Sequence, residues 1–288
     1  MAIGAARARP WFLLSPALTV ITFLLVAPVV FILIYSFWLR TSTGADQAGF
    51  YLSNWQEVLS DPFYRDILLS TLRIAAITTV VCAVTGYLPA YFIAMSKTRY
   101  KTLLLLLVIL PFWISYIIRT MSWINILGTT GALNTVLIGL GVIDKPLDLL
   151  YNEGAVILGL VHFLLPFIVL NVYVSLEAID RNLLDAARSL GASDLQSFFE
   201  VTLPLSLPGL AAGALLCFVL SAGTYITPVI LGGPRNAMFA NLVFDTIITQ
   251  LNWPLGSVLS IVLLIVLGSI VLIYNRLIGI GQFAKSFG

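Results

Sequence analysis

Charged residues are scarce in this chain. They make up 10% of its 288 residues, whereas 60% are hydrophobic, and the mean hydropathy is +1.03. A soluble domain of this length has no core large enough to bury so much apolar surface. The composition therefore predicts an integral membrane protein. The net charge of +2 is too small to argue for a nucleic-acid partner.

Cysteine and histidine are nearly absent. The two cysteines, Cys82 and Cys217, both lie inside apolar segments. We expect them to pack as small core residues and to form neither a disulfide nor a metal site. His162 has no ligand partner at metal spacing, so we expect a packed or hydrogen-bonded side chain within a span. No metal or cofactor site is predicted in this chain.

Catalytic and nucleotide-binding motifs are also missing. The sequence has no Gly-x-x-x-x-Gly-Lys phosphate loop, no Gly-x-Ser-x-Gly elbow and no His-Glu-x-x-His helix. We therefore expect a protein that is not an enzyme and draws energy from an ion gradient or another subunit. Gradient-driven carriers usually show paired repeats around polar intramembrane sites. The apolar segments here hold almost no carboxylate, which favours an ATP-driven system.

Long apolar segments are what the chain does contain, and their lengths predict an all-α protein with six transmembrane helices. The expected spans are residues 11–38, 67–95, 102–127, 154–176, 208–231 and 255–278. The first is about twice as long as the apolar part of a signal peptide, so we expect it to be retained and to be broken or kinked near Pro28. Shorter helices are expected near residues 54–59, 131–143 and 240–251.

The distribution of lysine and arginine sets the orientation. Placing residues 1–10 in the cytoplasm puts most cationic residues on that side, and leaves Arg40, Arg65, Lys145 and Arg235 in external loops. This predicts cytoplasmic N- and C-termini and a single transmembrane domain over residues 11–288. Arg119 lies about 27 Å along a helix from Lys101, near the opposite membrane face, so we expect it to snorkel there.

One polar stretch, residues 177–204, interrupts the apolar segments between the fourth and fifth spans. Its apolar residues from Ile179 recur at helical spacing, which predicts an amphipathic helix that ends at Gly191. Ser193 and Gln196 fit a capping box that begins a second short helix. We expect Pro204 to end that helix, so that the stretch presents a small apolar surface outside the membrane.

This stretch resembles the "EAA" coupling loop of bacterial ABC-importer permeases. The residues that carry the resemblance are Asp185, Ala186, Ala187, Gly191, Val201, Leu203 and Pro204. The family usually has Glu at the position of Asp185 and Ile at that of Val201. A hairpin that merely links two spans is the alternative. The resemblance implies that the loop docks on an ATPase subunit, with Asp185, Ala186, Ala187, Arg188, Gly191 and Pro204 as its coupling residues.

A wider resemblance covers nearly the whole chain. Pro111-Phe112-Trp113, Leu231-Gly232-Gly233 and Trp253-Pro254-Leu255-Gly256 look like the permeases of spermidine/putrescine importers, and most like the first permease of the pair. This implies a bacterial cytoplasmic (inner) membrane location and a heterodimer with a second permease. It also implies two ATPase subunits, which bind ATP and Mg²⁺, and an extracytoplasmic substrate-binding protein.

A polyamine is a flexible polycation, for which aromatic faces and carboxylates are a suitable lining. The candidate pathway residues are Trp113, Tyr116, Trp123, Tyr225 and Asp245. Each has a plainer explanation, since aromatic residues concentrate at membrane interfaces and Asp245 could cap or pair in a surface loop. Another small solute, such as an opine or an amino-acid derivative, remains open. So do a gradient-driven carrier and a membrane scaffold that transports nothing.

Overall fold

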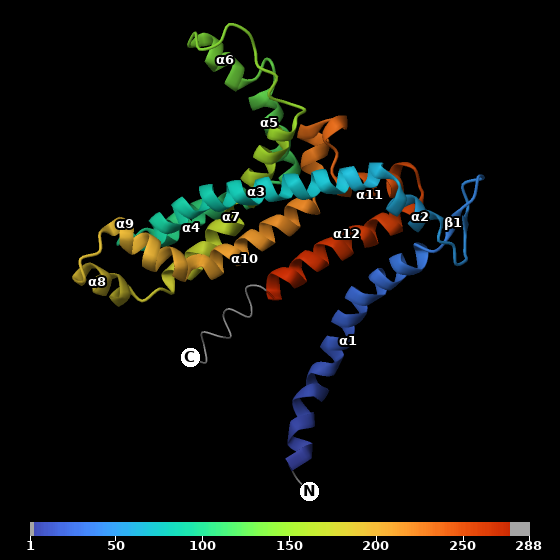
Figure 1. The fold of residues 1–288 in the computed structure, drawn as a ribbon, viewed down its shortest axis with the longest axis horizontal. Coiled ribbons are helices and arrows are strands. Elements are labelled where there is room, and N and C mark those ends of the chain that lie inside the picture. Colours follow the sequence, from blue (N-terminus) through green and yellow to red (C-terminus); the bar gives the residue numbers. More distant parts are fainter. Residues whose placement is uncertain (1–2, 277–288) are drawn as a thin grey trace. The chain divides into compact units, whose positions relative to one another are not determined.

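The computed structural model describes residues 3–276, and helices make up most of this part of the chain (Figure 1). The chain divides into two compact units. The first unit contains the chain up to Arg65 together with Leu242–Ile265. The second unit contains Asp66–Asn241 together with the chain from Val266.

The first unit begins with α1 (Ile3–Tyr35), followed by a two-stranded antiparallel pair and a short helix. The strands β1 (Leu39–Arg40) and β2 (Asp46–Gln47) were not expected from the sequence, whereas α2 (Ser53–Ser60) matches the helix expected near residues 54–59. The unit also holds the end of α11 (Phe239–Phe244), the π turn η5 (Asp245–Thr249) and the first part of α12 (Trp253–Tyr274).

Helix α1 continues through Pro28, so of the expected break or kink at this proline, the break is absent. Its apolar stretch Leu14–Tyr35 has a mean hydropathy of 2.9 and none of it is buried. After the helix, Tyr35 stacks on Trp38 with ring centroids 4.3 Å apart, and Asn54 Nδ2 donates to the Trp38 carbonyl at 3.1 Å. These contacts fix the turn that follows α1.

The second unit contains most of the remaining helices. They are α3 (Pro62–Met95), α4 (Lys101–Ile109), the 3-10 turn η1 (Leu110–Trp113), α5 (Tyr116–Leu127), α6 (Ala132–Gly139), α7 (Glu153–Glu177), α8 (Arg181–Ser189), α9 (Asp194–Ser197), the π turn η2 (Phe198–Thr202), α10 (Leu203–Ala222), the π turn η3 (Pro228–Gly232) and the 3-10 turn η4 (Pro234–Asn236). Helix α3 begins in the first unit, and α12 ends in the second.

Helix α7 is the centre of the second unit, where its Leu164, Ile168 and Val172 are fully buried. Residues from α3 and α10 pack on it, including the buried free thiols Cys82 and Cys217, which confirms their expected role as core residues. Glycines allow this close packing. A Cβ at position 209 on α10 would lie 2.3 Å from Ser175 Cβ on α7, and a Cβ at position 86 on α3 would lie 2.3 Å from Ile168 Cγ2. Since no Cβ fits there, α10 and α3 approach α7 at glycine distance.

Within residues 3–276, five helices are long and apolar enough to cross a membrane, or six if one bent pair counts as a single span. The bent pair is the third expected span, in which Lys101–Trp113 and Tyr116–Gly139 meet at 89°. Pro111 lacks the N–H that would continue α4, and the backbone of Ile114 is extended. The apolar segment expected at residues 131–143 forms the short helix α6 within this pair.

The fifth expected span differs at both ends. One helix runs from Asp194 to Ala222, so Pro204 does not end the preceding helix and the span does not start at Pro208. The π turn η2 accounts for this. Leu203 N–H bonds to the Phe198 carbonyl five residues back, and α10 then begins at Leu203, so that Pro204 lies in its first turn, where a proline is tolerated. The helix then stops at Gly223, before the expected end at residue 231. The end of the sixth expected span, residues 277 and 278, lies outside the described residues, as do the side chains of Arg7, Arg9 and Arg235.

Candidate coupling loop and pathway residues

The loop after α7 begins with a capped helix. Asp180 is the N-cap of α8, and its side chain accepts a hydrogen bond from Asn182 N–H at 2.9 Å. A capping carboxylate satisfies one of the free N–H groups of the first turn and is stabilised by the helix dipole. The amphipathic helix expected from the apolar spacing is therefore present and begins at Arg181.

Gly191 ends α8 as expected. Its φ is +88°, in the left-handed region that a residue without Cβ adopts at little cost. Gly191 N–H bonds to the Arg188 carbonyl and Ala192 N–H bonds to the Ala187 carbonyl, which together form a Schellman motif. A Cβ on Gly191 would meet no atom within 4 Å. Glycine is therefore needed at this position for its backbone conformation rather than for space.

The second short helix starts with the expected capping box. Gln196 N–H donates to Ser193 Oγ at 3.2 Å, and Ser193 N–H donates to Gln196 Oε1 at 2.8 Å. From there α9, η2 and α10 form one continuous helix into the membrane segment. The first expected helix, its end at Gly191 and the capping box of the second helix are thus present, and Pro204 lies within the first turn of α10.

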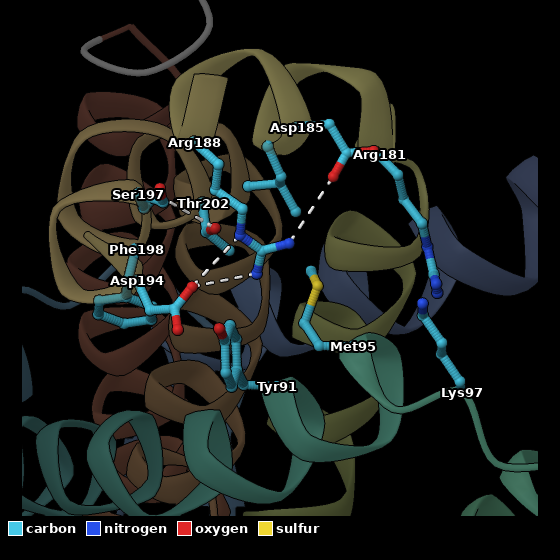
Figure 2. A pocket seen from close by; sticks show the side chains of 11 residues that line it. Tyr91, Met95, Lys97, Arg181, Asp185, Arg188, Asp194, Ser197, Phe198 and Thr202 are labelled. Carbon is cyan, nitrogen blue, oxygen red and sulfur yellow. Dashed lines mark hydrogen bonds and ion pairs between the residues drawn. The ribbon is translucent and has the colours of Figure 1, made fainter. Parts of the chain in front are cut away.

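A cavity of about 390 Å³ lies between α8, the start of the continuous helix and the end of α3 (Figure 2). Arg188 reaches across it. Its Nε and Nη2 donate to Asp194 Oδ1 at 3.3 and 3.1 Å, and its Nη1 lies 3.7 Å from Asp185 Oδ1. The structure therefore brings two of the sequence-predicted coupling residues, Asp185 and Arg188, into contact, and adds Asp194.

Two basic residues tie this loop to the end of α3. Arg181 Nη2 donates to the Ala94 carbonyl at 3.3 Å, and Lys101 Nζ donates to the same carbonyl at 2.7 Å. Lys101 also pairs with Glu177, the last residue of α7, at 2.9 Å. Cations are favoured at the C-terminal end of a helix, where the last carbonyls lack partners. Sequence reasoning placed these cations in the cytoplasm but did not predict this junction.

The outer face of the loop is apolar and exposed. Leu190 is 90% exposed, and Leu183, Leu195 and Phe199 are also exposed. Ala186 is exposed and Ala187 is half-buried, so neither blocks close approach by another chain. Several exposed large apolar side chains on one short polar segment are typical of a segment that binds another protein.

The pathway candidates of the second unit gather at two helix breaks. Tyr116 starts α5 after the bend, and its hydroxyl hydrogen-bonds to the hydroxyls of Thr224 and Thr227, which follow the end of α10. Tyr225 lies between these threonines, and its carbonyl accepts a bond from Asn241 Nδ2 at 2.7 Å. Trp113 is 81% exposed at the end of η1.

Trp123 binds the single histidine. Its Nε1 donates to His162 Nδ1 at 3.1 Å, and the two rings are at 82°. This confirms the expectation of a hydrogen-bonded His162 within a span. Among the described residues, no three or more His, Cys, Asp or Glu side chains are grouped so that they could hold a metal ion.

Asp245, the remaining pathway candidate, belongs to the first unit. It is exposed at the start of η5, where its Oδ2 accepts a bond from Gln250 Nε2 at 2.8 Å. Asp245 therefore pairs with a neighbouring side chain, as expected if it only caps or pairs within a surface loop.

Arg119 occupies a different position from the one predicted from the sequence. It does not snorkel: it is buried, with 7% of its surface exposed, and its Nη1 donates to the Pro111 carbonyl at 2.7 Å. The 27 Å separation assumed a continuous helix from Lys101, whereas the chain bends between them. Pro111, in the middle of the apolar run, was the signal that could have indicated the bend.

Comparison with known proteins identifies the family. Residues 83–280 match the model of the binding-protein-dependent transport system inner membrane component. The chain belongs to this family of inner-membrane transport permeases. It is similar to the spermidine/putrescine transport system permease protein PotB of Escherichia coli (strain K12), with 40% identity over 84% of this chain and 87% of PotB. The PotB protein of Haemophilus influenzae is 36% identical over 88% of both chains.

Among solved structures, the fold is similar to a chain of a bacterial ABC transporter involved in the import of the acidic polysaccharide alginate. The TM-score is 0.75 at 18% identity, over 96% of this chain and 98% of that one. At this identity the likeness concerns the fold. It shows that the helices of this chain are arranged as in a chain of that transporter.

Proposed function

We propose that this chain is a permease subunit of an ATP-driven importer of polyamines such as spermidine and putrescine. The observation that carries the proposal is the identity to PotB proteins across more than four fifths of both chains. The family itself is one of binding-protein-dependent transport components, which makes a non-catalytic membrane role the natural one. Another small solute, such as an opine or an amino-acid derivative, is the alternative within the same class.

In the membrane, the proposed arrangement has six spans, the third of them bent, and cytoplasmic N- and C-termini. Residues 1–10 are the cytoplasmic N-terminus, and residues 11–288 form one transmembrane permease domain. The excess of Lys and Arg on one side supports this orientation. It places the loop of residues 177–204 in the cytoplasm, where a soluble partner reaches it.

The partners in this proposal are a second permease, two ATPase subunits and an extracytoplasmic substrate-binding protein. The ATPase subunits bind ATP and Mg²⁺, and this chain binds no cofactor. Helix α8 and the exposed Leu190, Leu195 and Phe199 dock on one ATPase subunit. Asp185 and Arg188 make the polar contacts at the edge, while Ala186, Ala187 and Gly191 allow close approach.

The local geometry supports transmission of movement from this loop. The Schellman motif, the capping box and the contact between Arg188 and Asp194 make the turn between α8 and α9 a defined structure. From Asp194 the helix runs without a break through Pro204 to Ala222. Because rigid elements transmit displacement better than loose loops, closure of the ATPase dimer moves α10 along its length.

Uptake of labelled spermidine into vesicles containing the whole assembly, with binding protein and ATP on their proper sides, tests this proposal. We expect uptake that requires ATP, is blocked by excess putrescine and is unaffected by ionophores. Uptake that ionophores abolish and that needs no ATPase subunit would indicate a gradient-driven carrier. Uptake of other solutes only would keep the importer class and reject the polyamine.

A further inference from the structure

Arg119 is a buried cation without a carboxylate partner. It lies on the first turn of α5 with 7% of its surface exposed, and in the described part of the chain no acidic side chain is within ion-pair distance of it. A charged side chain inside a membrane segment is costly, and such residues persist where they have a function. The contacts of Arg119 indicate what this function is.

Three groups surround the guanidinium. Its carbon lies 5.8 Å from the ring centroid of Phe112 on η1 and 5.5 Å from that of Phe163 on α7. Its Nη1 donates to the Pro111 carbonyl at 2.7 Å. A planar, delocalised cation can stack on aromatic rings while it donates hydrogen bonds in its own plane. A lysine ammonium could reach a carbonyl here but could not stack in this way.

These contacts span the bend of the third membrane segment. The Pro111 carbonyl belongs to the last turn before the bend, where it also accepts Ile114 N–H at 3.2 Å. Arg119 belongs to the first turn after the bend. The side chain therefore holds the two halves of the segment at their 89° angle, and Phe163 fixes both against α7.

The bend positions Tyr116, which shares the first turn of α5 with Arg119. The Tyr116 hydroxyl bonds to Thr224 and Thr227, at the break that ends the continuous helix from Asp194. Three side chains, Tyr116, Thr224 and Thr227, thus connect the break after that helix to the bent segment. Non-helical backbone at membrane depth is tolerated where it is buried in protein or lines a cavity.

We propose that Arg119 is a positioning residue for transport, which holds α5 so that Tyr116 meets the broken end of α10. The inference rests on the proposed function, in which α10 receives movement from the coupling loop. When α10 moves, Tyr116 passes the displacement to α5 because Arg119 keeps α5 and η1 at a fixed angle. Without this contact, ATP hydrolysis continues and less solute crosses per ATP.

The functional test compares four variants in vesicles that contain the whole assembly. Arg119→Met removes the charge and the donor at similar length, Arg119→Lys keeps the charge, and Phe163→Leu removes one ring. Arg73→Met is the matched control, because Arg73 is an exposed arginine that pairs with Glu153. We expect Arg119→Met to lower solute transported per ATP about tenfold or more, with the half-maximal solute concentration unchanged within about twofold. We expect Arg119→Lys and Phe163→Leu each to lower solute transported per ATP by less than Arg119→Met does. Arg73→Met should transport as much solute per ATP as the parent.

A distance measurement between spin labels tests the geometry without any solute. Labels at Leu107→Cys on α4 and Met121→Cys on α5 flank the bend at exposed positions, whereas native Cys82 and Cys217 are fully buried. We expect one narrow distance distribution in the parent and a broadened one in Arg119→Met. Arg73→Met should keep the narrow distribution. Because no solute is needed, this result stands even if the solute is not a polyamine.

Two outcomes would overturn the inference. One is parent-like transport per ATP with a narrow distribution in both Arg119→Met and Phe163→Leu. The other is an Arg119→Lys protein that loses as much transport as Arg119→Met while both retain the narrow distribution. If Arg119→Met does not assemble, the same two measurements are made on Arg119→Lys and Phe163→Leu. Parent-like transport per ATP and a parent-like distance distribution in both variants reject the inference. Reduced transport per ATP together with a broadened distance distribution supports it.

Discussion

Arg188 donates to Asp194 through both Nε and Nη2, at 3.3 and 3.1 Å, and so joins α8 to the helix that continues into the membrane segment. The contact crosses the turn at Gly191, whose backbone conformation brings the two residues together. Both side chains are largely exposed. The pair therefore adds little to the stability of the fold, and we expect its effect to be on the rigidity of the loop.

Asp194→Asn tests this contact. An exposed ion pair contributes about 0.2–1 kcal/mol, which corresponds to at most about a fivefold change in an equilibrium. We expect an unchanged melting temperature and roughly a two- to fivefold loss of solute-stimulated ATPase activity. Glu200→Gln is the control, because Glu200 is an exposed acid on the same segment. Equal losses in both variants would show that the loss of negative charge, and not the Arg188 contact, is responsible.

Gly191 allows a graded test of the proposed coupling through the turn between α8 and α9. A residue with a Cβ is strained at a φ of +88° by about 1–2 kcal/mol, asparagine less than alanine, and proline cannot adopt it. We expect uptake and retention of the ATPase on purification to decrease in the order Gly, Asn, Ala, Pro. Gly139→Ala is the control, because a Cβ there also meets nothing within 4 Å and its φ is not positive. A Gly191→Pro assembly with parent activity would contradict the proposed role of the loop.

Gly209 tests the packing of α10 on α7. A Cβ at this position would lie 2.3 Å from Ser175 Cβ and 2.6 Å from the Asn171 carbonyl oxygen. Since backbone cannot move away cheaply, we expect Gly209→Ala to destabilise the protein by about 1–3 kcal/mol. Thermal melting of the detergent-purified protein measures this. Gly268→Ala should not lower the melting temperature, because no atom lies within 4 Å of a Cβ there; equal melting of both variants would reject the close packing.

Asp245 is a candidate for the solute pathway, and its hydrogen bond with Gln250 does not show whether it contacts the solute. If the solute is a polycation, loss of a pathway carboxylate weakens its attraction, so we expect Asp245→Asn to raise the spermidine concentration for half-maximal uptake several-fold, or roughly 1 kcal/mol. Gln250→Ala is the control, since it removes the hydrogen-bond partner and keeps the carboxylate. Uptake by Asp245→Asn with parent kinetics would remove this residue from the pathway.

The local structure of residues 177–204 could be predicted in detail because its interactions are local. The Asp180 side chain accepts a hydrogen bond from the N–H two residues later, and Ser193 and Gln196 bond to each other's backbone N–H groups. The hydrogen bonds of the turn at Gly191 join residues three and five positions apart. Such contacts depend on residue type and spacing. The sequence therefore predicted the first helix, its end and the start of the second helix.

The membrane segments were harder to predict because prolines act through their surroundings. Pro111 accompanies a bend of 89°, whereas Pro28, Pro204 and Pro208 lie in continuous helices. The helix continues through Pro204 because a π turn precedes it, and no residue type in the sequence predicts a π turn there.

Long-range partners were the second limit. Arg119 contacts Phe163, and Trp123 bonds to His162, each across about 40 positions of sequence. Hydropathy and spacing describe each segment alone. They therefore gave Arg119 the position it would take on a straight helix, and the buried position appears only when α5 and α7 are placed together.

The central claim is that solute transport by this permease is coupled to an ATPase through the loop of residues 177–204. The most direct test measures ATPase activity of the purified assembly in lipid, with its binding protein, while spermidine, putrescine and unrelated small solutes are titrated. We predict stimulation by the two polyamines, none by the unrelated solutes, and loss of the stimulation in Gly191→Pro. Polyamine-stimulated ATPase activity that is unchanged in Gly191→Pro would contradict coupling through this loop. ATPase activity that no solute stimulates would contradict the proposal that the assembly is an ATP-driven importer.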